Sequence, residues 1–477
     1  MYDAVVIGSG PNGLAAAITL ARAGLAVLVV EASETIGGGT RTMELTLPGF
    51  LHDVCSAVHP FGVASPFFRD LPLEAQGLEW VFPQAPLAQT FADGMASLVW
   101  RSLERTAEGF GLDREAYLGL FQPWLNSWQP LLAETLGPFP LLPRRPLLLA
   151  RFGWLAVRSA SRLARATFQT ERARTVFTGI AAHAMLPLDK PLTASFGLML
   201  GLLAHAVGWP VARGGSQSIS QAMGKVLVGL GGELRTNFPI AQWEDIPATR
   251  SIFFDLTPRQ IMAIAGDRFP SGYRRKLMRY RYGMGVFKMD WAMNEPIPWS
   301  SADLHLAGTI HIGGGLEEIE ASERAVGKGY VTEKPFVLLN QPSLIDPSRA
   351  PNGKHIAWAY CHVPNGSDVD MTEQIEAQIE RFAPGFRDCI LARHTISPLE
   401  MEAYNPNYVG GDINGGVQDL RQFFARPVAS LNPYETPLDD VYICSSATPT
   451  GGGVHGMCGY RAAQAMLKRY GKSLPKA

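Results

Sequence analysis

Asp3-Ala-Val-Val-Ile-Gly-Ser-Gly-Pro-Asn-Gly13 joins an apolar run to a glycine-rich turn in this chain of 477 residues. A short apolar run rich in β-branched residues is typical of a buried parallel strand. Gly8 suits the tight turn that ends such a strand, and Gly10 lets the backbone approach a diphosphate. Gly13 lets the following helix pack closely against the strand. The stretch therefore predicts the first half of a dinucleotide-binding unit.

A helix and a second strand are predicted directly after this turn. Residues 14–24 have the composition of a helix that ends at a glycine, and residues 25–30 repeat the apolar pattern of a buried strand. The unpaired N–H groups at the start of this helix, beside Pro11 and Asn12, would bind a diphosphate. Glu31 follows the second strand, where an acid can bind both hydroxyl groups of a ribose. The strand, turn, helix, strand and acid together predict a Rossmann-type site.

A second glycine cluster follows the acid. The spacing Glu-x5-Gly-Gly-x-x-Arg, from Glu31 to Arg41, resembles that of flavoproteins in the amine oxidase and phytoene desaturase superfamily. In that superfamily the loop passes the diphosphate, and its arginine contacts phosphate or flavin. The resemblance favours FAD over NAD as the cofactor. For Arg41 a surface salt bridge is the alternative. The residues implied to bind the cofactor here are Ala32, Gly38, Gly39, Thr40 and Arg41.

Another glycine-rich segment lies near the C-terminus, between a strand and a helix. Residues 440–444 predict a last parallel strand, residues 460–470 predict a helix, and residues 451–459 are rich in glycine. Backbone that carries few side chains can approach a flat ligand, and a helix N-terminus aimed at it would stabilise an anionic reduced flavin. We expect this segment to close over the flavin. The residues expected to contact the cofactor are Ser446, Gly453, Val454 and His455.

Both ends of the chain resemble the phytoene dehydrogenase-like branch of FAD-dependent oxidoreductases. This branch includes carotenoid desaturases and the pyridine-nucleotide-disulfide-oxidoreductase-domain-2 proteins. One departure is Ser445, where the family usually has glycine; its side chain would contact the cofactor or shift the loop. The resemblance implies an α/β fold with a discontinuous Rossmann-type FAD-binding domain, an inserted mixed-sheet substrate domain and a helical subdomain. It also implies that the backbone near Ile240 lies close to the adenine.

Five segments follow from this organisation. The FAD-binding domain is predicted to comprise residues 1–84, 211–250 and 436–477. Residues 85–210 are predicted to form a mostly helical substrate or lid subdomain. Residues 251–435 alternate apolar strands with aromatic residues, which predicts a sheet domain that roofs the flavin and binds substrate.

The composition indicates an ordinary globular protein. Hydrophobic residues make up 47% of the chain and charged residues 18%, and the 42 Lys and Arg residues balance the 43 Asp and Glu residues. A balanced charge gives no reason to expect nucleic acid as a partner. The five cysteines form no C-x-x-C pair, which argues against a disulfide framework, a structural metal site and a redox-active dithiol. We read no signal peptide at Met1 and expect a cytoplasmic protein.

Two segments bear on membrane contact. Residues 194–209 are apolar but too short for a spanning helix, and they predict a buried core helix instead. An apolar stretch further upstream is punctuated by arginines, a pattern that lies at a membrane interface or on an exposed helix face with snorkelling side chains. We therefore also expect peripheral contact with a membrane. The arginines are Arg144, Arg145, Arg151, Arg158, Arg162 and Arg165.

A flavin accepts a hydride or two electrons itself, so the protein needs to supply orientation, exclusion of water and at most one base. No catalytic triad or metal motif is suggested by the sequence. His455 is the candidate catalytic group because its glycine-rich segment should reach the flavin. The alternative is a structural histidine bonded to its own loop. The remaining histidines in apolar or aromatic settings are predicted to be satisfied core residues: His59, His183, His205 and His362.

The predicted function is that of an FAD-dependent dehydrogenase or desaturase. Its substrate is expected to be a small, mostly apolar organic molecule, such as an isoprenoid or polyene, that transfers a hydride to the flavin. The alternatives are a flavin amine oxidase, a redox-neutral polyene isomerase or saturase, and a flavoprotein scaffold without activity. The sequence holds a single Rossmann fingerprint, so the expected electron acceptor is oxygen or a quinone.

Overall fold

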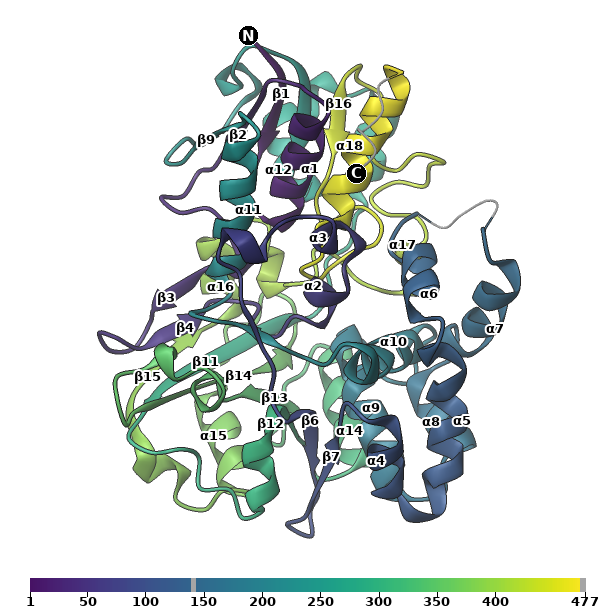
Figure 1. Ribbon diagram of the computed structural model, residues 1–477, viewed down its shortest axis with the longest axis vertical. Coiled ribbons are helices and arrows are strands. Elements are labelled where there is room, and N and C mark those ends of the chain that lie inside the picture. Colours follow the sequence, from purple (N-terminus) through teal and green to yellow (C-terminus); the bar gives the residue numbers. More distant parts are fainter. Residues whose placement is uncertain (139–142, 472–477) are drawn as a thin grey trace.

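The computed structural model describes residues 1–138 and 143–471. Two β-sheets at opposite ends of an elongated molecule organise this part of the chain, with a group of helices beside the larger sheet (Figure 1). The last residues of the predicted segment 436–477, residues 472–477, lie outside the described residues.

The smaller sheet has five strands in the order β16-β10-β1-β2-β9, and all of its pairs are parallel. Its strands come from distant parts of the sequence, which agrees with a discontinuous cofactor domain. Apolar residues in β1 alternate between two separate core clusters, one on each face of the sheet. A parallel sheet covered on both faces requires this pattern. The strands are β1 (Tyr2–Ile7), β2 (Val27–Val30), β9 (Glu233–Arg235), β10 (Thr249–Phe254) and β16 (Val441–Ile443).

Helices cover both faces of this sheet. On one face α1 (Pro11–Arg22) lies between α11 (Gln217–Gly229) and α18 (Met457–Arg469) (Figure 1). On the other face α12 (Pro258–Ala265) and α13 (Ser271–Met278) contribute apolar residues to the second core cluster. The helices and parallel strands predicted at both ends of the chain are thus present.

The larger sheet has seven strands in the order β15-β11-β14-β13-β12-β6-β7. It is mixed, because β12 pairs with β6 in parallel and the other pairs are antiparallel. The strands are β6 (Ala85–Thr90), β7 (Ala96–Val99), β11 (Gly285–Met293), β12 (Ala307–Ile312), β13 (Val337–Asn340), β14 (His355–Val363) and β15 (Ile390–Ile396).

The structure differs from the predicted division of the chain at two places. Residues 85–99, assigned to the helical subdomain, form β6 and β7 of the larger sheet. The predicted boundary between residues 250 and 251 falls inside β10, a central strand of the cofactor sheet. Both differences arise because strand pairing joins residues that are far apart in the sequence, which local composition does not record.

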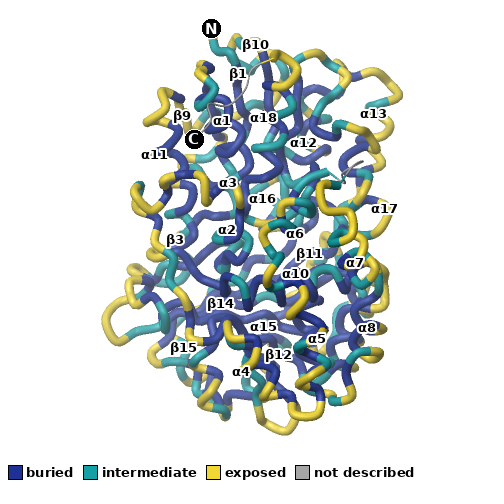
Figure 2. Tube along the Cα trace, turned by 45° about the vertical axis from the view of Figure 1, so that its right-hand side comes forward, coloured by how far each residue is buried: buried dark blue, intermediate teal, exposed yellow. Residues whose placement is uncertain are grey.

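The helical region packs around α10 (Thr193–Ala206), the predicted core helix, which lies deep in the molecule (Figure 2). No helix in the described part of the chain is both long and apolar enough to cross a membrane. The other helices of this region are α4 (Leu103–Glu108), α5 (Arg114–Leu125), α6 (Trp128–Thr135), α7 (Pro146–Ala156), α8 (Ala160–Thr167) and α9 (Glu171–Ala181).

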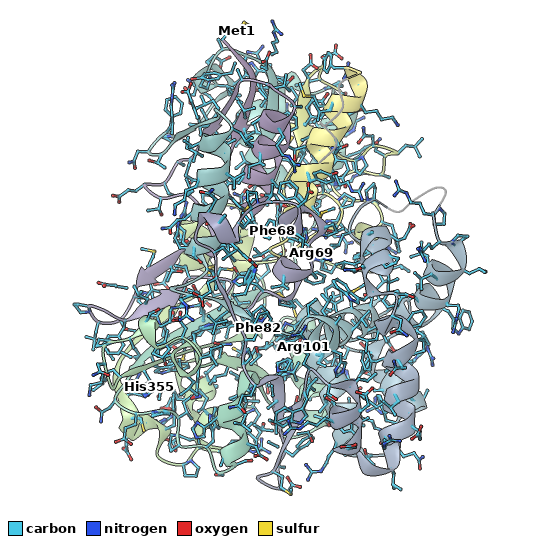
Figure 3. The ribbon with its side chains drawn as sticks, in the orientation of Figure 1. Met1, Phe68, Arg69, Phe82, Arg101 and His355 are labelled. Carbon is cyan, nitrogen blue, oxygen red and sulfur yellow. The ribbon has the colours of Figure 1, made fainter. Side chains whose placement is uncertain are left out.

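Shorter elements connect the two sheets. Among them, the β3–β4 hairpin brings Asp53 to Arg349, and the two side chains form a fully buried ion pair with a separation of 2.8 Å. Burial alone would raise the pKa of Asp53, but Arg349 and two further hydrogen-bond donors, the Ser216 amide and the Thr42 hydroxyl, hold that pKa below its ordinary value. On the surface between the two sheets, Phe82 and Arg101 lie side by side (Figure 3), with the guanidinium 6.0 Å from the ring centre. The remaining elements are β3 (Thr42–Glu44), β4 (Leu51–Asp53), β5 (Trp80–Val81), β8 (Val211–Ala212), α2 (Pro60–Ala64), α3 (Pro66–Arg69), α14 (Leu316–Gly327), α15 (Thr372–Glu380), α16 (Pro398–Tyr404) and α17 (Leu420–Phe423).

Candidate cofactor and substrate site

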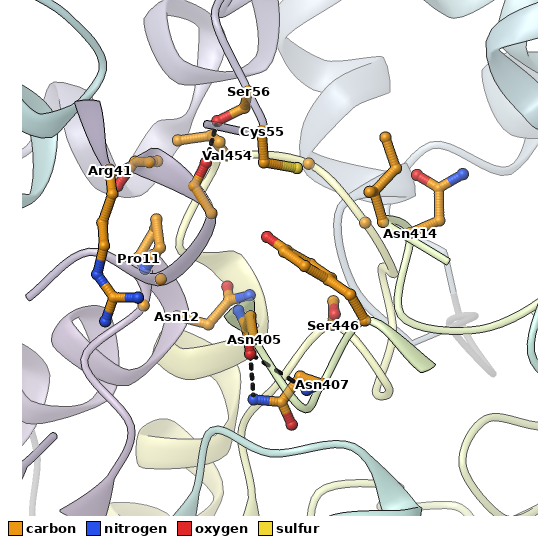
Figure 4. A pocket seen from close by; sticks show the side chains of 18 of the residues that line it. Pro11, Asn12, Arg41, Cys55, Ser56, Asn405, Asn407, Asn414, Ser446 and Val454 are labelled. Carbon is orange, nitrogen blue, oxygen red and sulfur yellow. Dashed lines mark hydrogen bonds between the residues drawn. The ribbon is translucent and has the colours of Figure 1, made fainter. Parts of the chain in front are cut away.

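A cavity of about 480 Å³ runs from the carboxyl ends of the parallel strands to the larger sheet. Ligands of open α/β sheets bind at this end of the strands, and a volume of several hundred Å³ is ordinary for a ligand site. Figure 4 shows residues from both ends of the chain around it, including Pro11 and Arg41 on one side and Ser446 and Val454 on others.

The glycine turn after β1 lies against the cavity. Gly8 has φ = +102°, a conformation that favours glycine, and both Gly8 and Gly10 line the cavity. A Cβ atom on Gly13 would lie 2.2 Å from the Gly8 carbonyl oxygen, so only glycine lets α1 pack this close to the strand end. Pro11 and Asn12 line the cavity at the start of α1, whereas Gly13 lies behind them.

Asp255, which the sequence analysis missed, occupies the same helix N-terminus. It directly follows β10, and its Oδ2 accepts a hydrogen bond of 2.9 Å from the Gly13 amide. A Cβ atom on Gly10 would lie 2.7 Å from that oxygen. Burial raises the pKa of Asp255 to about 7, and the nearby Glu31 carboxylate adds to the effect. An acid that directly follows an apolar strand was the signal that could have revealed it.

Glu31 is held by the protein through four hydrogen bonds. Its Oε2 accepts from the amide (3.1 Å) and the hydroxyl (2.6 Å) of Ser9. Its Oε1 accepts from the Ser33 amide and from Arg41 Nη2, both at 3.0 Å. A carboxylate offers about four acceptor positions, so ribose hydroxyls would replace part of this set. Glu31 and Ala32 both line the cavity, as predicted for the ribose end.

Arg41 forms a buried ion pair with Glu31 and is 5% exposed. Its Nε also donates to the Thr35 carbonyl oxygen at 3.0 Å, and the guanidinium lies over the Tyr404 ring. The alternative of a surface salt bridge is therefore wrong, because the pair is closed off by the loop and by Tyr404. Arg41 lines the cavity, and its contact with a phosphate or flavin stays a prediction.

The second glycine loop lies directly on the first. A Cβ atom on Gly38 would lie 3.3 Å from the Gly10 Cα, and one on Gly39 would lie 2.0 Å from the Tyr408 hydroxyl. The Thr40 hydroxyl donates to the Gly37 carbonyl oxygen at 2.8 Å and so braces the turn. Glycine is thus required here for contacts within the protein as well as for close approach of a ligand.

Apolar side chains line part of the cavity beyond Glu31. Ile240 and Phe238 line this part, and the Phe238 amide donates to the Glu31 carbonyl oxygen at 2.8 Å. The strand β9 before this part of the chain covers only Glu233–Arg235. The remaining residues form a connection that folds back over the strand end. An apolar slot beside a ribose site is suited to an adenine ring.

The C-terminal glycine segment forms another wall. Ser446, Gly453 and Val454 line the cavity. The Ser445 hydroxyl donates to the Leu256 carbonyl oxygen at 2.7 Å, which ties the loop to the end of β10. The helix α18 begins at Met457, three residues before the predicted start, because Gly456 adopts a left-handed conformation at its N-cap.

His455 is buried and turned into its own loop. Its Nδ1 accepts from the Met457 amide at 3.0 Å, and its Nε2 lies 3.1 Å from the Thr450 hydroxyl. It is not among the described residues that line the cavity. Burial lowers the pKa of His455 to about 4. This geometry favours the loop-bracing alternative, and the catalytic role stays a prediction.

The end of the cavity at the larger sheet is walled mainly by apolar and aromatic side chains. Trp358 and Tyr360, on one face of β14, stack with ring centres 5.6 Å apart and an angle of 9° between their planes. The other lining residues of this part are His183, Phe196, Leu200, Trp209, Thr309, Leu338, Leu339 and Asn340.

Several lining residues were not expected from the sequence. Two of them lie just after β4 and the others lie between residues 404 and 414, and no local motif that we used marks either segment. Some hold the loops by hydrogen bonds, as Ser56 does to the Gly39 carbonyl oxygen at 3.0 Å (Figure 4). The unexpected residues are Cys55, Ser56, Tyr404, Asn405, Asn407, Tyr408 and Asn414.

The residues present fit a dinucleotide. One cavity joins a side-chain-poor backbone loop, a helix N-terminus, an acid at a strand end and an apolar slot. These are the parts that a diphosphate, a ribose and an adenine require. The closing wall from the C-terminal segment leaves a flat ligand room between the two sheets.

Comparison with known proteins agrees with this arrangement. A family model described as an NAD(P)-binding Rossmann-like domain matches residues 6–71. Pyridine nucleotide-disulfide oxidoreductase domain-containing protein 2 of Rattus norvegicus is 25% identical, across 98% of this chain and 93% of the relative. The neurosporene-forming phytoene desaturase of Rhodobacter capsulatus is 25% identical, across 96% of this chain and 92% of the relative.

Solved structures share the whole fold. An oxidoreductase from Methanosarcina mazei superposes with a TM-score of 0.67 at 15% identity, covering 98% of this chain and 99% of its own. A putrescine oxidase with putrescine bound superposes with a TM-score of 0.63 at 17% identity, covering 98% of each chain.

Fold, site and relatives define the class: this chain is an FAD-dependent oxidoreductase that is similar to phytoene desaturases. Within that class, its homologues over nearly the full length are phytoene desaturases and pyridine nucleotide-disulfide oxidoreductase domain-containing protein 2. The predicted resemblance to the phytoene dehydrogenase-like family is confirmed, and FAD is the cofactor.

Proposed function

We propose that this enzyme oxidises a small, mostly apolar molecule of the isoprenoid or polyene class by transfer of a hydride to FAD. The supporting observation is the cavity, which is continuous from the dinucleotide end to a chamber with apolar walls. When bound, the flavin supplies the electron chemistry.

The side chains of the chamber have two tasks in this proposal. Phe196, Leu200 and Leu338 exclude water from the reacting bond. The stacked rings of Trp358 and Tyr360 present a flat surface against which a conjugated or allylic segment can lie. Hydride transfer requires alignment of the donor carbon with the acceptor, and such walls provide that orientation.

Anaerobic reduction of the FAD-loaded enzyme tests the proposal. The protein is mixed with a panel of polyenes, alkylamines and aromatic molecules, and the loss of oxidised-flavin absorbance is followed. Reduction by a polyene or isoprenoid is expected. Reduction by alkylamines alone would make the enzyme an amine oxidase. Isomerisation of a polyene without net reduction would indicate redox-neutral chemistry, and a flavin that no member reduces or changes would favour a scaffold.

The electron acceptor is proposed to be oxygen or a quinone. The support is the single Rossmann fingerprint of the sequence, which the FAD site uses. Reoxidation of the reduced enzyme by air, by a soluble quinone and by NADP⁺ separates these acceptors. Reoxidation by NADP⁺ at a rate comparable with the quinone would contradict the proposal.

We further propose that α7 makes peripheral contact with a membrane. This helix lies at the outer edge of the helical region (Figure 1), and its Leu147 and Trp154 are 80% and 76% exposed. Exposed Arg144, Arg145 and Arg151 surround these apolar side chains. An apolar face bordered by arginines is suited to the interface of an anionic bilayer, where an apolar substrate would also be dissolved.

A further inference from the structure

His183 is a polar group at the substrate end of the cavity, where the sequence predicted a satisfied core residue. It lies in a single helical turn after α9 and packs edge-on against Trp209, with ring centres 5.5 Å apart. The residue is deep in the molecule, yet it retains accessible surface because it lines the cavity. Its Nε2 lies 3.2 Å from Nε2 of His311.

Gln89 is the register partner of His311 on the neighbouring strand β6. Gln89 Nε2 donates to the carbonyl oxygens of Thr90 and Gly313, both at 3.1 Å, so the amide orientation is fixed. The Gln89 Oε1 and the His311 Nδ1 both face Gly179: a Cβ atom there would lie 2.4 Å and 3.0 Å from them. Neither atom has a hydrogen-bond partner among the described residues, and both lie beside the same small space at Gly179.

This arrangement decides where the protons lie. One proton must stand between the two Nε2 atoms of a neutral histidine pair. If His311 supplied it, two bare acceptors, His311 Nδ1 and Gln89 Oε1, would lie beside the same space at Gly179 with no donor between them. The favoured state therefore has a proton on His311 Nδ1 and another on His183 Nε2. His183 Nδ1 then carries a bare lone pair.

His183 Nδ1 has no hydrogen-bond partner in the part of the chain that the structure describes. Burial lowers the pKa of His183 to about 3 and that of His311 well below its ordinary value. Both rings are thus neutral near pH 7, and the lone pair is free to accept a hydrogen bond from a ligand.

Further polar atoms lie on the same face of the sheet. Thr309 precedes His311 by two residues on β12, and its register partner is Asn340. The Thr309 hydroxyl and Asn340 Oδ1 have no hydrogen-bond partner among the described residues, and both residues line the cavity. The Asn340 amide group donates to the Gly308 carbonyl oxygen at 2.6 Å, so Oδ1 is an acceptor. A chamber that is otherwise apolar thus has one polar corner.

We infer that His183 Nδ1 accepts a hydrogen bond from the substrate, so that the substrate is an apolar molecule carrying one O–H or N–H group. The inference rests on the proposed function, which places the substrate in this chamber. It narrows the class of expected substrates from pure hydrocarbons to alcohols or amines with an apolar body. The apolar body packs on the aromatic walls, and the donor group lies at His183.

Binding of four matched ten-carbon probes to the FAD-loaded enzyme tests this inference. The probes are geraniol, geranylamine, geranyl methyl ether and 2,6-dimethylocta-2,6-diene, measured by calorimetric titration under anaerobic conditions. We expect the alcohol or the amine to bind about five- to tenfold more tightly than the ether, which has no donor. A preference for one of the two donors identifies which group the enzyme recognises.

Variants test whether His183 causes the tighter binding of probes that carry a hydrogen-bond donor. His183→Phe should abolish it, and His183→Gln, which keeps an acceptor, should retain part of it. His205→Phe is the matched control, because His205 is another buried histidine among aromatic rings but does not line the cavity. FAD content and the melting temperature establish that each variant is folded. The comparison of alcohol with ether in the unaltered enzyme needs no variant at all.

The outcomes separate the inference from the proposed function. Equal binding of alcohol, amine, ether and hydrocarbon would overturn the role of His183 and leave the apolar chamber intact. A donor preference that survives in His183→Phe would overturn it as well. If no probe binds, the hydrocarbon included, the proposed function itself fails.

Discussion

At the scale of single residues, Asp255 places a buried acid where the diphosphate of the cofactor must bind. Its carboxyl accepts a hydrogen bond from the Gly13 amide at the N-terminus of α1, and burial raises the pKa of Asp255 to about 7. A diphosphate at the same helix end is negative, so it will favour the protonated form of Asp255 and raise that pKa further. FAD binding and protonation of this residue are therefore coupled.

The coupling predicts how FAD affinity depends on pH. Below pH 7 Asp255 is largely protonated in the free protein, and affinity should be constant. Above pH 7 the free protein loses this proton while the complex keeps it. Affinity should then fall by up to about tenfold per pH unit, until the pKa of the complex is reached. Asp255→Asn should remove this dependence. Fluorescence titration between pH 6 and pH 9 measures it, and an equal slope in the variant would exclude Asp255 as its source.

His455 provides a second test at this scale. If it acts as an acid or base, His455→Ala should keep its FAD and slow flavin reduction by about 10²–10⁴-fold. Its hydrogen bonds to the Met457 amide and toward Thr450 favour the other outcome: FAD content and melting temperature fall, and reduction per bound flavin stays close to normal. Rapid-mixing reduction, normalised to bound FAD, distinguishes the two. Thr450→Val is a matched control that perturbs the loop without removing the imidazole.

The sequence was informative about residues whose roles depend on backbone. Gly8 and Gly13 were predicted from a local motif, and the structure shows a positive φ at Gly8 and close packing at Gly13. Side-chain partnerships were not predictable in the same way. The ion pair of Arg41 with Glu31 depends on rotamers, and the contact of Asp255 with Gly13 joins residues that meet only because β10 lies beside β1.

At the scale of elements, α18 packs closely against α1, although the two helices are far apart in the sequence. A Cβ atom on Gly459 would lie 1.7 Å from the Asn12 carbonyl oxygen, in the first turn of α1. The C-terminal helix therefore packs directly against the turn that binds the diphosphate. Its position fixes both the glycine wall before it and the start of α1.

We predict that Gly459→Ala separates these helices. Overpacking at a backbone contact costs about 1–3 kcal/mol of unfolding free energy, and FAD affinity should fall with it. Gly119→Ala is the control, because a Cβ atom on this helical glycine of α5 meets nothing within 4 Å. That variant should gain about 0.4–1 kcal/mol. Chemical denaturation of both variants measures the difference in unfolding free energy. Equal changes in the two variants would show that the α1–α18 contact accommodates the added methyl group.

Elements with a strong local pattern were predictable, and elements defined by distant pairing were not. The strand–turn–helix units around α1 and α18 were predicted from apolar runs and glycines, with ends that differ by a few residues. The strands β6 and β7 were missed because they precede a long helical stretch. They join the larger sheet through β6, whose partner β12 lies more than two hundred residues away in the sequence.

At the scale of the whole molecule, the cavity lies between the two sheets. The helical region lies beside the larger sheet, and α7 is at the outer edge of that region (Figure 1). The sequence predicted the class of fold because that depends on the ends of the chain. It did not predict the shape of the substrate chamber, which is assembled from α10, β13 and β14 and so depends on how the middle of the chain packs.

The last prediction concerns the surface of α7. Leu147 and Trp154 are seven residues apart, so they lie on one face of the helix, and both are mostly exposed. Burying two such side chains in a bilayer interface is worth about 1.5–3 kcal/mol each, and each arginine near an anionic surface adds about 1 kcal/mol. Sedimentation with phosphatidylserine-containing vesicles should carry the enzyme down, and salt should weaken the binding. Leu147→Ser combined with Trp154→Ser should reduce partitioning by more than about tenfold. Leu112→Ser, at a side chain 80% exposed on another part of the helical region, should change little. Binding that persists in the double variant, or that is equal with neutral phosphatidylcholine vesicles, would show that α7 does not bind the membrane in this way.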